Sequence, residues 1–314
     1  MDILMLSAAE VEHLLDLDAL LDGLALGFQA LSQGTIVAPQ RNEVTTPNGY
    51  LLAMPAWQEA LPLSVKIVSV FHENSRFGLP GHQAVICLFD QETGTPVAVM
   101  DGTYITAIRT AGAAAVATQL LARKEAHVLT ILGAGVQGAS HLKLFPRLRD
   151  FSDIRIASLY FSDAQRLAAS HPQARSLASF EEAVRGADVI CLCSTSSTPI
   201  LHLDWLAPGA HVTSIGYMPP GGELERTIIE HGRLFVETRL AFEPPPAGCD
   251  ELAGFDPHLA TELGEVLLGY RPGRQTSHEV TVYKAMGHAM EDMVAAYLVY
   301  QQAQQQGIGQ IVRL

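Results

Sequence analysis

Hydrophobic and polar residues recur with two different periods in the first third of the chain. After Ser7 and Glu10, which form a capping box, leucines recur at helical spacing until Gly34 ends the helix. Four extended runs follow at residues 50–57, 63–71, 82–90 and 95–101, with turn residues between them. Short turns between consecutive strands predict an antiparallel sheet, so residues 1 to about 110 are expected to be α+β.

The rest of the chain alternates helices with strands. Residues 106–123 are rich in alanine and predict a helix, and apolar runs at 128–132, 154–158, 188–193, 211–215 and 234–237 predict buried strands. Further helices are expected from residue 133 to about 149, at 164–170 and at 180–185. This alternation is typical of a parallel, doubly wound sheet. An extended segment at 280–283 leads into a last helix that presents Met286, Met290 and Met293 on one face.

Composition excludes several classes of protein. The chain has 314 residues, enough for two domains, and its 48% hydrophobic and 17% charged residues exclude a disordered chain. A net charge of −13 opposes binding to nucleic acid. The acidic N-terminus lacks the basic region of a signal peptide, no stretch is long enough for a membrane span, and no CxxC pair occurs. We therefore expect a cytoplasmic protein. The histidines are scattered and do not stand at the spacing of metal ligands, so no metal site is expected.

A glycine motif predicts a dinucleotide site. Gly133-Ala134-Gly135-Val136-Gln137-Gly138 directly follows the strand at 128–132 and opens a helix. The first glycine permits the tight turn, the second lets the backbone approach a pyrophosphate, and the third lets the helix pack on the sheet. The helix N-terminus then offers free N–H groups to the phosphates.

The residue that faces the cofactor's ribose is expected at the end of the next strand, at Ser158. No acidic residue stands there to hold a free 2′-hydroxyl, and a small neutral residue tolerates a 2′-phosphate. The cofactor is therefore expected to be NADPH or NADH, with NADPH favoured, although no arginine follows and Asp163 is near.

Three cations stand in apolar or extended surroundings: Arg41, Lys66 inside a strand, and Arg109 inside a helix. A buried cation needs an anionic partner. One interpretation is a clamp for a substrate carboxylate. The alternative, for each of them alone, is a structural salt bridge or a side chain whose charged end reaches solvent.

Besides these, the chain carries several distinctive segments: Val65-Lys66, Gly78-Leu-Pro-Gly-His-Gln83, Met100-Asp-Gly-Thr-Tyr-Ile-Thr-Ala-Ile-Arg-Thr-Ala-Gly112, Leu132-Gly-Ala-Gly-Val-Gln137, Cys193-Ser-Thr-Ser-Ser197, Gly209-Ala-His-Val-Thr-Ser-Ile-Gly216, Thr281-Val-Tyr-Lys-Ala-Met-Gly287 and Glu291-Asp292. Together they resemble the ornithine cyclodeaminase/mu-crystallin family over essentially the whole chain. The resemblance implies a Rossmann domain at 113–284 and an α+β domain at 1–112 plus 285–314 that binds substrate and forms a homodimer.

The resemblance also assigns roles. Arg41, Lys66 and Arg109 match the family's carboxylate-binding cations, and Thr110, Gln137, Ser194, Thr195, Ile215 and Gly216 match positions that line the cofactor. One departure concerns the acid with which ornithine cyclodeaminases handle a proton. Its position here is Met218, which is neither acid nor base, so ornithine cyclodeamination is not expected.

These features favour a ketimine reductase. It would deliver a hydride to Δ1-pyrroline-2-carboxylate, giving L-proline, and to Δ1-piperideine-2-carboxylate, giving L-pipecolate. Three alternatives stay open: an ornithine cyclodeaminase with another acid, an alanine-type amino-acid dehydrogenase, and a non-catalytic crystallin-like binding protein.

Overall fold

The computed structural model describes residues 1–314, with all their side chains but that of Ser75. The chain forms two compact units. The terminal unit comprises Met1–Arg109 and His288–Leu314, and the central unit comprises Thr110–Gly287. Helix α3 (Thr103–Leu121) contributes residues to both units. No helix in the described part of the chain is long and apolar enough to cross a membrane.

The terminal unit is built on one sheet, ordered β16-β1-β7-β6-β5-β4-β2, with β3 paired to β4. All pairs are antiparallel, as predicted, except β1 with β7, which is parallel. Strands β1 and β16 had no counterpart in the prediction; they pair with each other near the two ends of the chain. The strands are β1 (Asp2–Leu6), β2 (Ile36–Val37), β3 (Asn42–Thr46), β4 (Gly49–Gln58), β5 (Leu63–Val70), β6 (His82–Phe89), β7 (Pro96–Asp101) and β16 (Gln310–Arg313).

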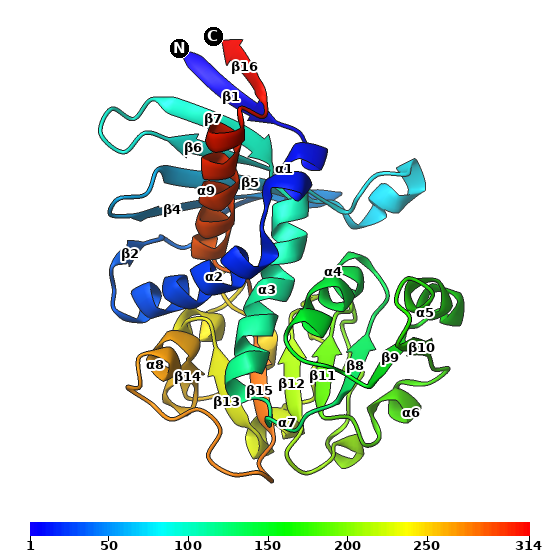
Figure 1. Ribbon diagram of the computed structural model, residues 1–314. Coiled ribbons are helices and arrows are strands. Elements are labelled where there is room, and N and C mark those ends of the chain that lie inside the picture. The colour runs from blue at the N-terminus through cyan, green and yellow to red at the C-terminus, as the bar shows by residue number, and fades with distance from the viewer. The chain divides into compact units, whose positions relative to one another are not determined.

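Three helices accompany this sheet: α1 (Ala8–Leu14), α2 (Leu17–Ser32) and α9 (Ala289–Gln306). The single helix predicted before Gly34 is in fact two, because the Asp16 side chain accepts a hydrogen bond from Ala19 N (2.8 Å) and starts α2. Helix α9 packs on β4, β5 and β6 and on α2 (Figure 1). Met290 and Met293 are fully buried, as expected for a core face, but Met286 precedes the helix and belongs to the central unit.

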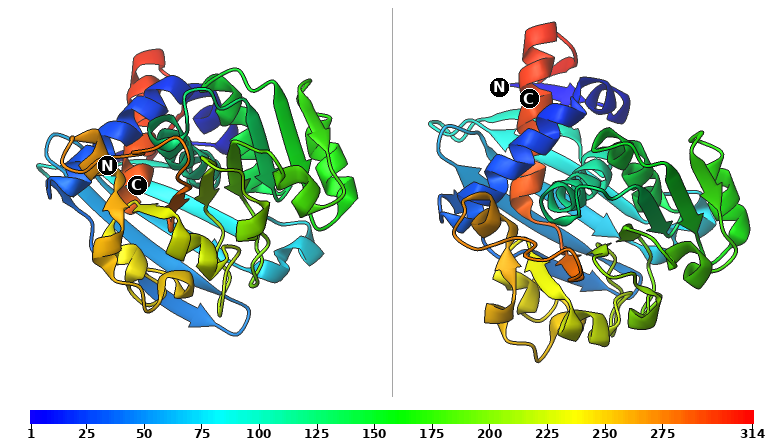
Figure 2. Two further views of the ribbon diagram at one scale, coloured as in Figure 1. Left: turned by 90° about the horizontal axis from the view of Figure 1, so that it is seen from below. Right: turned by 60° about the horizontal axis from the view of Figure 1, so that its bottom comes forward.

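The central unit is a doubly wound parallel sheet, which confirms the predicted fold class. Its order is β10-β9-β8-β11-β12-β15-β13-β14, and every pair is parallel. Helices lie on both sides of the sheet (Figure 2). The strands are β8 (Val128–Leu132), β9 (Asp153–Ala157), β10 (Ala174–Ser176), β11 (Val189–Leu192), β12 (His211–Ser214), β13 (Arg233–Val236), β14 (Thr261–Glu262) and β15 (Thr281–Lys284); the helices are α4 (Val136–Leu144), α5 (Phe161–Ala168), α6 (Phe180–Val184), α7 (Arg226–His231) and α8 (Leu263–Leu267).

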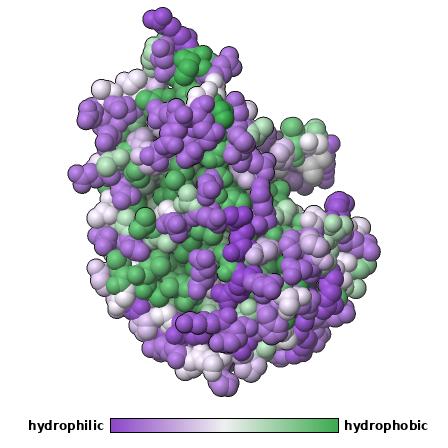
Figure 3. Space-filling view, in the orientation of Figure 1, coloured by the Kyte–Doolittle hydropathy of each residue, from purple (hydrophilic) through white to green (hydrophobic). Residues whose placement is uncertain are grey.

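Burial explains the two hydrophobic patterns. Every residue of β8 and β11 is buried, because a parallel strand with helices on both faces has no solvent side. In β5, buried residues alternate with more exposed ones, as in a sheet that covers its core on one face only. Hydrophobic residues also reach the surface in several places among hydrophilic ones (Figure 3).

The strand order places a topological switch between β8 and β11. The chain leaves β8 toward β9 on one side of the sheet and later returns to β11 on the other side of β8. Open parallel sheets bind their ligands at the carboxyl ends of the strands beside such a switch. The predicted glycine motif begins at this edge, directly after Leu132.

Candidate functional site

Two of the three predicted cations are buried in the terminal unit. Lys66 on β5 is 2% exposed and Arg109 on α3 is 4% exposed. Lys66 Nζ lies 2.9 Å from Asp292 Oδ1 and 2.8 Å from Oδ2. Arg109 Nε donates to Asp292 Oδ1 (2.9 Å), and its Nη1 donates to Glu291 Oε2 (2.5 Å). The two cations therefore share one carboxylate, Asp292.

The first turn of α9 supplies both acids. His288 and Glu291 form a capping box, in which His288 N donates to Glu291 Oε1 (3.0 Å). Carboxylates are favourable at this end of a helix because the N-terminal N–H groups carry partial positive charge. Glu291 and Asp292 were quoted for the family resemblance, but the sequence assigned them no role. Two adjacent acids that open a largely buried helix are the feature that could have indicated one.

Arg41 directly precedes β3, whose register ends with Asn42 opposite Ala53. The residue of β4 after Ala53 is Met54, which is the partner of Lys66 on β5. Arg41 is half-buried, and its charge acts on Lys66.

The charges of this cluster suit one anion. Burial and, after it, the charge of Arg109 lower the pKa of Lys66, Asp292 opposes both effects, and the pKa is about 8 as a result. Lys66 and Arg109 do form buried salt bridges, which was the alternative to a clamp for a substrate carboxylate. Nevertheless, Lys66 and Arg109 both lie within hydrogen-bonding distance of the same Asp292 carboxylate. Two buried cations side by side form the kind of site that a further carboxylate binds.

The glycine motif of the central unit has the shape that a dinucleotide requires. Gly133 has φ +111°, and a Cβ there would lie 2.4 Å from Cys193 O at the end of β11. A Cβ on Gly138 would lie 2.1 Å from Gly133 O, so α4 packs closely on the turn. A Cβ on Gly135 would meet nothing within 4 Å. The space over Gly135 is the space that a pyrophosphate needs.

The start of α4 has free donors. Gly135 is its N-cap and provides no side-chain cap, so the first N–H groups stay available for phosphate oxygens. Val136 is 68% exposed at this helix start. The residues present therefore fit a nicotinamide dinucleotide.

Most other predicted cofactor residues follow the carboxyl ends of neighbouring strands. Ser158 follows β9, Ser194 and Thr195 follow β11, and Ile215, Gly216 and Met218 follow β12. Because all these strands are parallel, their carboxyl ends share one edge of the sheet with the glycine motif. Thr110 differs, since it lies on α3 and not beside a strand end.

The sequence-based prediction assigned no role to three buried charged residues of the central unit. Glu223, Glu251 and Lys284 lie in the loops and strand end around Ser194 and Gly216. Their partners are distant in sequence, so no local pattern indicates them.

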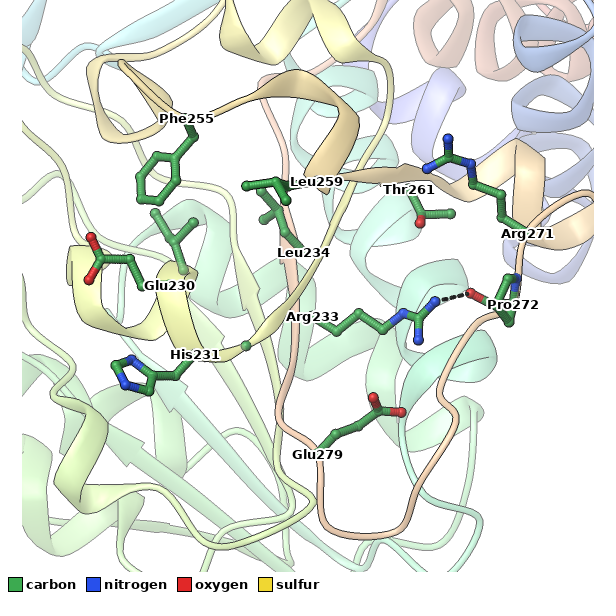
Figure 4. A pocket seen from close by; sticks show the side chains of 12 residues that line it. Glu230, His231, Arg233, Leu234, Phe255, Leu259, Thr261, Arg271, Pro272 and Glu279 are labelled. Carbon is green, nitrogen blue, oxygen red and sulfur yellow. Dashed lines mark hydrogen bonds between the residues drawn. The ribbon is translucent and has the colours of Figure 1, made fainter.

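The central unit also has a pocket of about 730 Å³, which lies away from the glycine motif (Figure 4). It is lined by residues around the start of β13 and β14, including Arg233, Thr261 and Glu279. Those are the amino ends of the strands, opposite the edge with the glycine motif. Its charged groups already have partners: Arg233 donates to Pro272 O, and Glu279 accepts from Thr276 N. We therefore assign the cofactor to the glycine motif and not to this pocket.

Among the described residues no cluster of histidine, cysteine or carboxylate side chains could hold a metal ion.

Comparison with known proteins agrees with this architecture. The model of the ornithine cyclodeaminase/mu-crystallin family matches residues 1–307. The ketimine reductase mu-crystallin of Mus musculus is 38% identical over 304 residues, which cover 94% of this chain and 96% of that protein. The Thermococcus litoralis Δ1-pyrroline-2-carboxylate reductase, solved with NADH and L-proline, is 30% identical, with a TM-score of 0.93 over 99% of this chain and 100% of the other. An archaeal alanine dehydrogenase dimer with bound NAD is 28% identical, with a TM-score of 0.89 over 100% of both chains.

Proposed function

Because the chain belongs to the ornithine cyclodeaminase/mu-crystallin family, we propose that it is an NAD(P)H-dependent ketimine reductase. It reduces Δ1-pyrroline-2-carboxylate to L-proline and Δ1-piperideine-2-carboxylate to L-pipecolate. The observation that carries the proposal is the buried pair Lys66 and Arg109, which meet at the Asp292 carboxylate. The relatives named as ketimine and pyrroline-carboxylate reductases support the same substrate class.

The terminal unit binds and orients the substrate. Lys66 and Arg109 pair with its carboxylate, and Arg41 adds a third positive charge. Reduction of the imine needs one hydride at carbon and one proton at nitrogen. With a pKa of about 8, Lys66 is mostly protonated at neutral pH and can donate that proton. Asp292 holds the ammonium in place while it does so.

The central unit binds the cofactor. The glycine motif and the start of α4 hold the diphosphate, and the residues after β11 and β12 line the remainder. When bound, the reduced nicotinamide supplies the hydride. We propose that NADPH is preferred over NADH. Ser158 carries no charge, and the nearby Asp163 is paired with Arg166 (2.7 Å), so neither repels a 2′-phosphate strongly.

Met218 cannot supply the acid that ornithine cyclodeamination requires at this position. It follows Gly216 in the loop after β12 and is half-buried. A thioether can neither bind a second amino group as a carboxylate does nor transfer a proton. An apolar side chain at this position suits the apolar ring of a cyclic imine.

We also propose that the protein forms a homodimer through the outer face of the terminal sheet. This face carries exposed apolar side chains, from Ile67 at 36% to Val44 at 63%, and the register places them on one side: Val44, Leu51, Trp57, Leu63, Ile67 and Val85. A second copy offers the same apolar face, as a twofold interface requires.

Sedimentation should show a dimer for the wild type and a monomer for Ile67→Glu. A monomeric wild type at micromolar concentration would rule the interface out.

A substrate panel separates the proposed function from its alternatives. We expect loss of the absorbance of NADPH with Δ1-pyrroline-2-carboxylate, a higher kcat/KM with NADPH than with NADH, and no release of ammonia or formation of proline from L-ornithine with NAD⁺. An alanine-type dehydrogenase would instead turn over pyruvate with ammonia. A binding protein would bind ligand and oxidise no cofactor.

A further inference from the structure

A buried charged cluster lies behind the loops that follow β11 and β12. It consists of Glu223, Glu251 and Lys284, and is called the Glu223 cluster here. Glu223 and the Lys284 side chain are 0% exposed, and the Glu251 side chain is 3% exposed. Burying three charges is costly unless each is paired and hydrogen-bonded. The partners therefore indicate what the cluster stabilises.

Glu223 joins the two loops directly. Its Oε2 accepts from Ser194 N (2.8 Å) and Ser194 Oγ (2.7 Å), after β11. Its Oε1 accepts from Gly216 N (2.7 Å) and Ser214 Oγ (3.1 Å), at the end of β12. One carboxylate thus satisfies two backbone donors from two neighbouring strand ends.

Lys284 extends the cluster to a third strand. It ends β15, donates to Gly216 O (2.7 Å) and Ser214 Oγ (3.1 Å), and forms an ion pair with Glu251. The second oxygen of Glu251, Oε1, accepts from Leu224 N (3.0 Å), next to Glu223. The ends of β11, β12 and β15 are therefore tied together through charged hydrogen bonds.

Two glycines leave the space that the carboxylates occupy. A Cβ on Gly216 would lie 2.1 Å from Ser194 O and 2.6 Å from Glu223 Oε2, and a Cβ on Gly222 would lie 2.0 Å from Glu251 Cδ. A larger residue in place of Gly216 would therefore clash with the Ser194 backbone as well as with Glu223, and one in place of Gly222 would displace the Glu251 side chain. Apolar residues could fill the same space more cheaply, but they could not satisfy the N–H groups of Ser194 and Gly216.

We propose that Glu223 is a positioning residue of the cofactor site, which fixes the loops carrying Ser194, Thr195 and Ile215 in the conformation that binds a nicotinamide dinucleotide. The inference rests on the proposed cofactor site of the central unit. Glu223 acts through these loops and does not itself touch the cofactor. Burial raises the pKa of the Glu223 carboxyl, and the Lys284 ammonium opposes this and favours its charged form, while Glu251 pairs with Lys284.

The test is Glu223→Gln, with Glu225→Gln as the matched control. Glutamine keeps the size but turns one acceptor into a donor, so either Ser194 or Gly216 loses its partner. We expect the Kd for NADPH, measured by fluorescence titration, and the KM for NADPH to rise about tenfold or more. The kcat at saturating NADPH and the KM for the imine should stay within about threefold. Glu225 accepts from Leu203 N (2.9 Å), away from these loops, so its variant should bind NADPH normally.

A lower melting temperature with an unchanged Kd for NADPH would overturn the proposal, because the cluster would then only stabilise the fold. If Glu223→Gln does not fold, Ser214→Ala removes two hydrogen bonds of the cluster, one donated to Glu223 and one accepted from Lys284, while the Lys284–Glu251 ion pair stays. This variant should raise the same Kd about threefold. No change in that variant would equally overturn the proposal. The binding titration needs no imine, so failure of the reductase assay with intact NADPH binding would affect the proposed function and not this inference.

Discussion

Replacing Lys66 by methionine should lower kcat/KM for Δ1-pyrroline-2-carboxylate about a thousandfold and leave the Kd for NADPH unchanged. The variant loses a charge-assisted hydrogen bond to the substrate and a proton donor, and it leaves the buried Asp292 with one partner fewer. Losing one partner of a buried charged pair costs roughly 2–5 kcal/mol, which spans a thousandfold change. Steady-state kinetics and a separate NADPH titration measure the two effects.

The exposed Lys124 offers a matched control, and Lys124→Met should keep the activity of the wild type. Activity of Lys66→Met within about tenfold of the wild type would show that Lys66 does not bind the substrate.

The same lysine should set the alkaline limb of the pH profile. Its protonated form is the active one, and its pKa is about 8, so kcat/KM should fall as the pH rises above about 8. Asp292 raises that pKa against the effects of burial, Arg109 and Arg41. In Asp292→Asn the limb should therefore move to lower pH. A limb that stays in place would assign it to another group.

Replacing Gly135 by alanine should weaken binding of NADPH and NADH about a hundredfold without unfolding the protein. The backbone angles of Gly135, φ −84° and ψ −161°, are open to alanine, and the new methyl group meets no protein atom within 4 Å. It occupies instead the space that we assign to the pyrophosphate. Loss of one or two charge-assisted bonds from backbone N–H groups accounts for this magnitude. Titration with both cofactors and a melting curve measure binding and fold separately.

Gly133→Ala provides the contrast. A Cβ there lies 2.4 Å from Cys193 O, and φ is +111°, so this variant should lose stability as well as binding. Normal cofactor affinity in Gly135→Ala would show that the pyrophosphate does not lie over the glycine motif.

Most of the fold could be predicted from local sequence patterns. The strand at 128–132 and the glycine motif were predictable because both rest on contacts within a few residues. Lys66 stood out because a charge inside an apolar strand has few explanations. The break between α1 and α2 depends on one capping residue, Asp16, within a run of leucines, and the leucine pattern concealed it.

Long-range partners were not predictable from the residues. Asp292 is 226 positions from Lys66, and nothing near either residue specifies the pairing. Strands β1 and β16 are short and lie near opposite ends of the chain, so their pairing leaves no local pattern. The acids of the Glu223 cluster follow no local pattern either, since only the folded chain brings Glu223 to Ser194 and Gly216.

The most direct test of the account is the fate of the hydride. Purified protein is incubated with Δ1-pyrroline-2-carboxylate and NADPH deuterated at C4 of the nicotinamide, on either face in turn, and the product is examined by chiral chromatography and mass spectrometry. The account predicts L-proline with one deuterium at C2 from one of the two cofactors. Proline without deuterium from both, or no proline formed from the imine, would contradict it.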